Sequence, residues 1–448
     1  MKNHFETIRA EEALKQKTLE KAKKGSRKKL LISSVSAAAA VLAAVIGLAA
    51  FAPSWINGSG NDGTAESGGM FSDGNGSGLA GEIADMPSTG DLWEDGAAAA
   101  PEEGAPAGTA VPESQAQTKM TAAVLDDHLY FEQWLERSNA KEFDAYGFKA
   151  DRRITVKVTG QNGIALSFAN VVLIDAQGNI LYAAVTDIRG TAYLFYDYYR
   201  NASGAPAAIR AEFLGQTAET AVFKGQDQYA LSFNAVSDAP EALDLLFMID
   251  TTGSMGDELE YLKEETAQML TELTLTYSTQ VSINFYRDEG DAYVVKSNPF
   301  TADIAEAAAQ LRQETVDGGG DYPEAVEKAL ENGISGHPWR ENSVKIVFLV
   351  LDAPAHKTEG VSQSLLQSIE AAARRGIRLV PVMASGADEA AEILCRQLAL
   401  FTGGRFVFIT DHSGIGSTHR EPITTVAYEV KPLITILKEV IYAYTKVD

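Results

Sequence analysis

From Leu243 onward, strand-length apolar runs alternate with amphipathic helical stretches, and this alternation restricts the possible folds more than any other feature. The apolar runs are "LDLLFMID", "QVSINFYRD", "VKIVFLVLD", "RLVPVM" and "GRFVFIT". The helical stretches include "DELEYLKEETAQMLTEL", "PEAVEKALEN", "SLLQSIEAAARRG" and "DEAAEILCRQLAL". Apolar strands alternating with helices are typical of a mainly parallel sheet covered on both faces. We therefore predict a doubly wound α/β domain over residues 241–412, with "AYVVKSN" as a candidate edge strand.

Two of these strands end in an acid that directly follows the apolar residues. Asp250 closes "LLFMID" and Asp352 closes "VFLVLD". Open parallel sheets bind their ligands at the carboxyl ends of the strands. Thr252 and Ser254 follow Asp250 at intervals of two residues, so alternate side chains of one loop can face a single point. The sequence therefore predicts that two acids and two hydroxyls lie close together at one edge of the sheet.

Two enzyme classes carry motifs close to "DTTGS". An aspartic protease needs an uninterrupted Asp-Thr-Gly in two copies on an all-β fold, whereas here a second threonine interrupts the motif and the pattern is α/β. A haloacid-dehalogenase-type phosphoryl-transfer enzyme uses Asp-x-Thr-Gly-Thr, and "DGGGD" at residues 317–321 is similar to its terminal metal acids. Those acids follow a catalytic lysine late in that fold, while here three strands still follow. The phosphoryl-transfer enzyme is kept as an alternative.

A divalent cation accounts best for the spacing. Mg²⁺ takes six oxygen ligands and retains some of its waters. The hydroxyls of Thr252 and Ser254 supply neutral ligands, and Asp250 and Asp352 bind directly or through water. An ion with few direct carboxylates stays electrophilic, so an acidic group of a partner can occupy its remaining position. The structural alternative, that the hydroxyls only cap the following helix, explains one hydroxyl but not the two-residue spacing with a second strand-end acid.

With these motifs in place, Leu243 to about Ile409 resembles a von Willebrand factor type A domain. "FMIDTTGSM" is similar to the metal-ion-dependent adhesion site of that family, with Thr252 in place of the more usual serine. "GGGDYPEAVEKAL" resembles its second loop, "IVFLVLDAP" its strand-end acid, and "LALFTGGRFVFIT" its final helix and strand. The resemblance implies Mg²⁺ or Mn²⁺ as cofactor, a protein ligand that offers a carboxylate, and no catalysis.

One position departs from the family pattern. Where many members carry a metal-binding threonine in the second loop, this chain has Gly320, which lacks a side chain. Asp321 is therefore added to the predicted metal ligands, acting directly or through water. Asp288, in "YRDEGD", and the adjacent Arg287 either line the rim of the site or form a local ion pair. His356 is either within reach of the site or an ordinary loop histidine.

The region before the α/β domain has a different pattern of apolar and polar residues. Short β-rich runs separated by "QNG", "AQGN" and "IRG" predict a β-sandwich spacer at residues 151–238. It resembles the immunoglobulin-like or transthyretin-like modules of bacterial surface proteins. Residues 121–150 are predicted as a short helical lead-in, with Trp134 and Leu135 packed inward. Residues 413–448 are expected to include a final helix packed on the α/β domain.

The N-terminal third predicts a membrane anchor and a stalk. Residues 30–52 form an uncharged apolar run long enough to span a bilayer. Residues 1–29 carry a net charge of +6, and no Lys or Arg occurs between the run and Lys119. The positive-inside rule then gives a basic cytoplasmic tail and an extracytoplasmic remainder at the cell membrane. A cleaved signal peptide is the competing interpretation. Residues 53–120, rich in Gly, Ala, Ser, Pro and acids, are predicted to be a disordered linker.

The net charge and the cysteine content exclude some classes of partner and of covalent structure. Beyond residue 29 the net charge is −29, which argues against nucleic acid as a partner. The single cysteine, Cys395, allows no internal disulfide and lies at helical spacing among apolar residues, so we expect a buried small hydrophobe. We therefore expect metal-dependent adhesion or protein recognition without catalysis. A scaffold or sensor subunit of a cell-envelope complex is the alternative.

Overall fold

The computed structural model describes residues 119–137, 145–200, 204–237, 240–273 and 276–446. The predicted cytoplasmic tail, the membrane helix and nearly all of the predicted linker lie outside the described residues. Within the described ranges, no helix combines the length and apolarity that crossing a membrane requires.

The α/β domain is built on a sheet that has eight strands within the described residues, in the order β11-β10-β9-β12-β13-β14-β1-β15. The five central strands are parallel: β10 (Ser278–Tyr286), β9 (Ala242–Asp250), β12 (Ser343–Leu351), β13 (Ile377–Met383) and β14 (Phe406–Thr410). The short strand β11 (Val295–Lys296) pairs antiparallel with β10 at one edge. The prediction of a large, mostly parallel sheet is therefore confirmed, and "AYVVKSN" supplies an edge strand.

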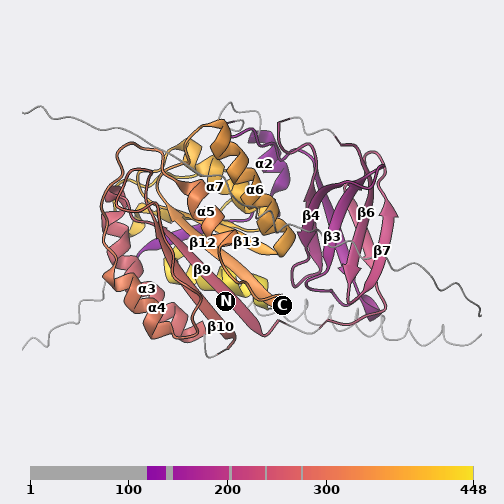
Figure 1. Ribbon diagram of the computed structural model, residues 1–448, viewed down its shortest axis with the longest axis horizontal. Coiled ribbons are helices and arrows are strands. Elements are labelled where there is room, and N and C mark those ends of the chain that lie inside the picture. The colour runs from indigo at the N-terminus through magenta and orange to yellow at the C-terminus, as the bar shows by residue number, and fades with distance from the viewer. Residues whose placement is uncertain (1–118, 138–144, 201–203, 238–239, 274–275, 447–448) are drawn as a thin grey trace, which may run out of the picture. The chain divides into compact units, whose positions relative to one another are not determined.

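Helices cover both faces of this sheet (Figure 1). One face packs against α3 (Gly256–Leu273), α4 (Ile304–Gln313) and α8 (Leu433–Thr445). The other packs against α5 (Val326–Ser335), α6 (Glu359–Arg375) and α7 (Glu389–Thr402). Successive side chains of β9 enter opposite cores, because strand side chains alternate between faces: Leu245 and Phe247 lie in the first core, Leu246 and Met248 in the second.

The last two strands on the far side of the sheet come from the two ends of the described chain. Strand β1 (Thr121–Leu125) pairs antiparallel with β14, and β15 (Lys431–Pro432) pairs with β1. The segment predicted as a helical lead-in does contain a helix, α2 (Phe131–Arg137), in which Trp134 is buried, but it begins with this strand. The β module therefore stands in the chain between the first strand of the sheet and the rest of the domain.

The β-rich region before the α/β domain forms the strands β2 to β8. Within the described residues the strands make two sheets, ordered β5-β2-β8 and β4-β3-β6-β7. Their bounds are β2 (Arg153–Thr159), β3 (Asn170–Asp175), β4 (Ile180–Val185), β5 (Thr191–Phe195), β6 (Pro206–Phe213), β7 (Gln216–Ala221) and β8 (Gln228–Ser232). Inward side chains of both sheets, among them Val156 and Leu173, share one buried core.

Buried polar contacts fix the β module to the α/β domain. The hydroxyl of Tyr182 donates a hydrogen bond to the carbonyl of Phe401 in α7. The Arg378 guanidinium donates to the carbonyl of Val185 at 2.7 Å and to that of Thr402 at 2.9 Å. Phe195 and Phe401 pack edge to face, with ring centroids 4.9 Å apart. The module predicted as a spacer thus packs directly on the domain that follows it.

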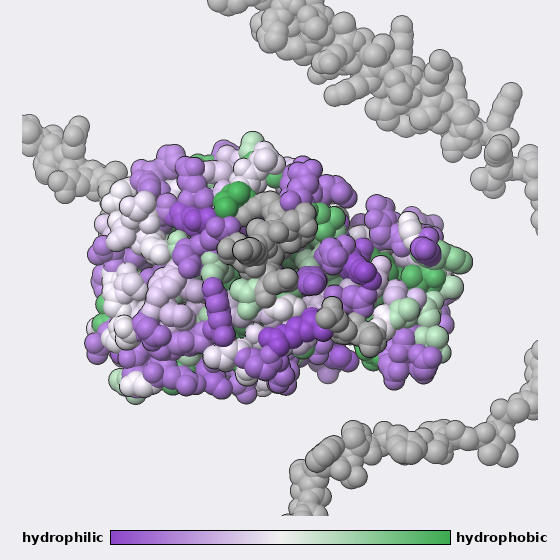
Figure 2. Space-filling view, turned by 90° about the horizontal axis from the view of Figure 1, so that it is seen from above, coloured by the Kyte–Doolittle hydropathy of each residue, from purple (hydrophilic) through white to green (hydrophobic). Residues whose placement is uncertain are grey.

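The face of the molecule in Figure 2 is mostly hydrophilic, in line with the acidic composition. Among the exposed large hydrophobic side chains are Leu214 and Phe223 of the β module, 76% and 59% exposed.

Cys395 lies in α7 with no exposed surface. Burial raises the pKa of its thiol, so the reactive thiolate is disfavoured. We predict that a thiol reagent such as Ellman's reagent leaves the native full chain unmodified and reacts with one thiol per chain after denaturation. Absorbance in native buffer and in guanidinium chloride measures this. Rapid reaction in native buffer would show that α7 opens readily.

Candidate metal centre

The two strand-end acids meet at the carboxyl edge of the sheet. Strands β9 and β12 are adjacent and parallel, with Ile249 paired to Val350. Asp250 is the last residue of β9, and Asp352 follows the last residue of β12. Their side chains are 0% and 3% exposed. The sheet register therefore brings these two buried carboxylates to neighbouring positions.

The loop after β9 adds two hydroxyls to the acids. The backbone N–H and the hydroxyl of Thr252 both donate to Oδ1 of Asp250, at 2.9 and 2.7 Å. The hydroxyls of Thr252 and Ser254 are 3.4 Å apart. A short 3-10 turn, η4 (Gly253–Met255), leads into α3, and Thr252 makes no side-chain capping hydrogen bond to it. Helix capping therefore does not explain Thr252, and the predicted convergence of oxygens is present.

One oxygen of each strand-end acid lacks a protein partner. Oδ2 of Asp250 and Oδ1 of Asp352 are buried and, among the described residues, have no partner within hydrogen-bond geometry, although the Tyr286 hydroxyl is near enough to lower the pKa of Asp250. Burial, followed by the charge of Asp352, raises the pKa of Asp250 to about 7. Burial also raises the pKa of Asp352, against the effect of the Ser254 hydroxyl. Unpaired buried carboxylate oxygens are costly, and a cation between them would remove that cost. The donor set fits a divalent cation with oxygen ligands.

The second loop contributes a residue that the sequence analysis missed, Glu324. Its side chain is 3% exposed, and its backbone N–H donates to the carbonyl of Pro354 at 3.0 Å. Gly319 lies close to both Thr252 and Glu324: a Cβ built on it would lie 3.0 Å from Cβ of Thr252 and 3.1 Å from Oε1 of Glu324. The Glu324 carboxylate is therefore close to Thr252. Burial, followed by the charges of Asp250 and Asp288, raises its pKa to about 9. Glu324 therefore belongs to the same acidic centre.

Asp321, the ligand predicted from this loop, has an exposed carboxylate that groups with Asp288 and His356. Its part in the first centre stays a prediction. The sequence signal for Glu324 was weak, because an acid just before an apolar helix is usually a solvated first-turn residue.

Arg287 supports the site from within and does not line its rim. Its side chain is buried and donates to the carbonyl of Thr315 at 2.7 Å. Its guanidinium lies 4.6 Å from the ring centre of Tyr293, whose hydroxyl is 2.8 Å from the hydroxyl of Thr251. These contacts hold the first loop at Thr251, next to Asp250.

Comparison with known proteins agrees with this geometry. Residues 244–418 match the model of the von Willebrand factor type A domain. The alpha-protein kinase vwkA of Dictyostelium discoideum is 30% identical over 172 residues, which are 37% of this chain and 27% of that protein. An ariadne-like RING finger protein of Acanthamoeba polyphaga mimivirus is 29% identical over 133 residues, 30% of this chain and 13% of that protein. The chain thus spans well under half of either relative.

Among solved structures, BatB from Bacteroides thetaiotaomicron aligns with a TM-score of 0.30 and 16% identity, over 37% of this chain and 89% of that chain. The family match defines a von Willebrand factor type A domain at residues 244–418. Domains of this class generally mediate protein–protein interaction or adhesion, and they commonly bind a divalent metal. At the level of the domain class, the family match supports the expectation of protein recognition.

Proposed function

We propose that this chain is a metal-dependent protein-binding protein without catalytic activity. Asp250, Thr252, Ser254 and Asp352 would hold Mg²⁺ or Mn²⁺, and Glu324 would supply the second-loop ligand in place of a threonine. The bound ion would accept a carboxylate of a protein partner at its remaining position. The unpaired, buried oxygens of Asp250 and Asp352 are the observation that carries the proposal.

The surroundings of the site favour a large partner. Ser254 is exposed, so the centre opens to solvent on that side. Tyr322 is 43% exposed, and its hydroxyl donates to the carbonyl of Asp352 at 3.2 Å. An exposed aromatic ring beside a metal centre offers contact area of the kind that protein interfaces use.

The proposal also includes the cell membrane as location, with an N-terminal anchor at residues 30–52 and an extracytoplasmic binding domain. This part rests on the apolar run and on the charge difference across it.

The change Asp250→Ala is expected to lower Mg²⁺ affinity by more than about 100-fold, because it removes a ligand that lies at the bottom of the site. The fold should persist, since the lost carboxylate has an unpaired oxygen. Calorimetric titration of Mg²⁺ into the full chain and the variant measures the change, with circular dichroism as the folding check. Asp257→Ala, at an exposed acid in the first turn of α3, is the matched control. Equal heats for wild type and Asp250→Ala would contradict the metal site.

Protein recognition is tested by a crosslinking pulldown with the full chain, with and without a chelator. We expect capture that requires the divalent cation, is lost in Asp250→Ala and is competed by an acidic peptide. Capture that neither the chelator nor the variant affects would overturn the proposal. Phosphatase turnover that Asp250→Asn abolishes would overturn the assignment as a non-enzyme.

A further inference from the structure

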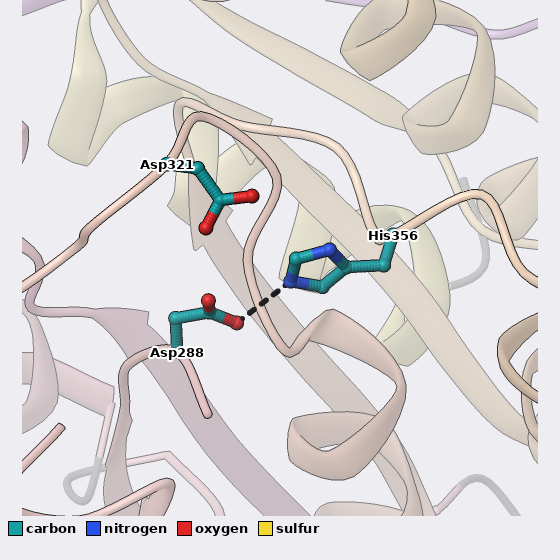
Figure 3. Close-up of side chains that lie close together, drawn as sticks. All are labelled: Asp288, Asp321 and His356. Atoms are coloured by element: carbon teal, nitrogen blue, oxygen red, sulfur yellow. Dashed lines mark hydrogen bonds and ion pairs between the residues drawn. The ribbon is translucent and has the colours of Figure 1, made fainter. Parts of the chain in front are cut away.

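A second set of metal-ligand side chains lies in the loops around the first centre. Asp288 follows β10, Asp321 lies in the second loop, and His356 lies in the loop after β12. One ligand atom of each lies within 4.8 Å of the other two. Figure 3 shows the two carboxylates and the imidazole ring pointing toward a common space. The Nε2 atom of His356 is 2.9 Å from Oδ1 of Asp288.

The spacing of these atoms suits a shared ion. In a tetrahedral Zn²⁺ site with bonds of about 2.1 Å, neighbouring ligand atoms lie about 3.4 Å apart. Three atoms within 4.8 Å of one another therefore need to approach by at most about 1.4 Å, which side-chain rotation can supply. The side chain of His356 is 29% exposed and Asp321 is exposed, so an ion can enter from solvent.

A separate observation, at Glu324, points to a cation in this region. Its side chain is 3% exposed, and its Oε2 has no partner among the described residues. After burial, the largest contributions to its raised pKa are the charges of Asp250, Asp288 and Asp352, in that order, so both sets act on it. Glu324 therefore carries a buried oxygen without a protein partner, and charges of both sets act on its carboxylate.

The charge balance supports the same conclusion. Asp288 is itself only 6% exposed, and its ion-pair partner is His356. Within the described residues, no Lys, Arg or His forms an ion pair with Asp250, Asp352 or Glu324. One divalent ion at the first centre would balance Asp250 and Asp352, and the carboxylates of Asp288 and Asp321 would remain opposed by a single histidine.

We propose that Asp288, Asp321 and His356 form a second cation site, and that this site takes a late first-row dication such as Zn²⁺ in preference to Mg²⁺ or Ca²⁺. Imidazole nitrogen is a ligand for Zn²⁺ and its neighbours, whereas Mg²⁺ and Ca²⁺ select oxygen. Three protein ligands with an open fourth position are a common zinc arrangement. The site goes beyond the proposed function and does not depend on it.

The test titrates Zn²⁺ into the full chain in excess Mg²⁺, followed by calorimetry and by metal analysis after desalting. We expect one Zn²⁺ per chain, with affinity at least tenfold lower in His356→Gln and in Asp321→Asn. The matched controls are His412→Gln and Asp151→Asn, at an exposed histidine and an exposed aspartate. With Co²⁺ in place of Zn²⁺, the visible absorption band should change in His356→Gln and not in His412→Gln.

Two results would overturn the second site: absence of Zn²⁺ binding by the wild-type chain in excess Mg²⁺, or equal Zn²⁺ affinity in His356→Gln and wild type. The Asp250→Ala variant separates the two proposals. It should keep Zn²⁺ while losing Mg²⁺, so failure at one site is distinguishable from failure at the other.

Discussion

Replacing Arg396 by methionine is expected to lower the free energy of unfolding by about 3–5 kcal/mol, the usual cost of breaking a buried ion pair. The Arg396 side chain is 4% exposed and donates to both carboxylate oxygens of Asp127, at 2.9 and 2.5 Å. It also donates to Glu392 at 3.1 Å. Asp127 lies two residues after β1, so this pair joins the end of β1 to α7. Methionine would leave Asp127 buried without its cation.

Chemical denaturation followed by circular dichroism measures this loss. Arg374→Met, on the exposed surface of α6, is the matched control and should change stability by less than about 0.5 kcal/mol. The double variant Arg396→Met with Asp127→Leu should recover part of the loss, because it removes the uncompensated carboxylate. A loss below about 1 kcal/mol in Arg396→Met would mean that the pair is effectively solvated.

The features that the sequence predicts well are those encoded locally. The central strands of the sheet are apolar along nearly their whole length because both faces are covered. That pattern can be recognised without knowing how the helices are arranged. Asp250, Thr252 and Ser254 lie within five residues of one another, so a single loop conformation fixes their convergence. Asp352 joins them because the carboxyl ends of parallel strands share one edge of the sheet.

The features that escaped prediction depend on long-range pairing or on loop conformation. Strand β1 joins the sheet by pairing with β14, and the paired residues Thr121 and Thr410 are 289 residues apart. Nothing in the short apolar run of β1 indicates this pairing. The exposure of Asp321 and the burial of Glu324 follow from the conformation of the second loop. Gly318 and Gly319 both have positive φ, 81° and 79°, a conformation that glycine adopts readily. This turn determines which later acid faces inward, and residue spacing alone does not reveal it.

Packing of the β module on α7 is a third feature of this kind. The short β-rich runs predicted the strands, but they do not encode the contacts of Tyr182 with Phe401 or of Arg378 with Val185. A tyrosine hydroxyl and an arginine usually face solvent, and here both are buried because they bond backbone carbonyls across the two parts.

Without divalent cations, the stability of the fold is expected to fall as pH rises from about 4 to 7. The pKa of Asp250 is about 7 in the folded chain and about 3.9 in an unfolded one. Below both values the acid is protonated in both states, and no penalty arises. Between them the folded state keeps a proton that the unfolded state releases, so rising pH favours unfolding by up to about 1.4 kcal/mol per pH unit. Glu324, with a pKa of about 9, extends the trend to higher pH.

Bound Mg²⁺ should reverse this trend, because it stabilises the ionised carboxylates that burial disfavours. Melting temperatures of the full chain between pH 5 and 8, in EDTA and in saturating Mg²⁺, measure the effect, and the difference between the two curves should widen as pH rises. Mg²⁺ binding at pH 7 should also release about half a proton from Asp250 and close to one from Glu324, since their pKa values are about 7 and about 9. Calorimetry in buffers of different ionisation enthalpy detects these protons. Parallel melting curves without proton release would mean that Asp250 is already ionised without the metal, and the unpaired oxygens would then need another explanation.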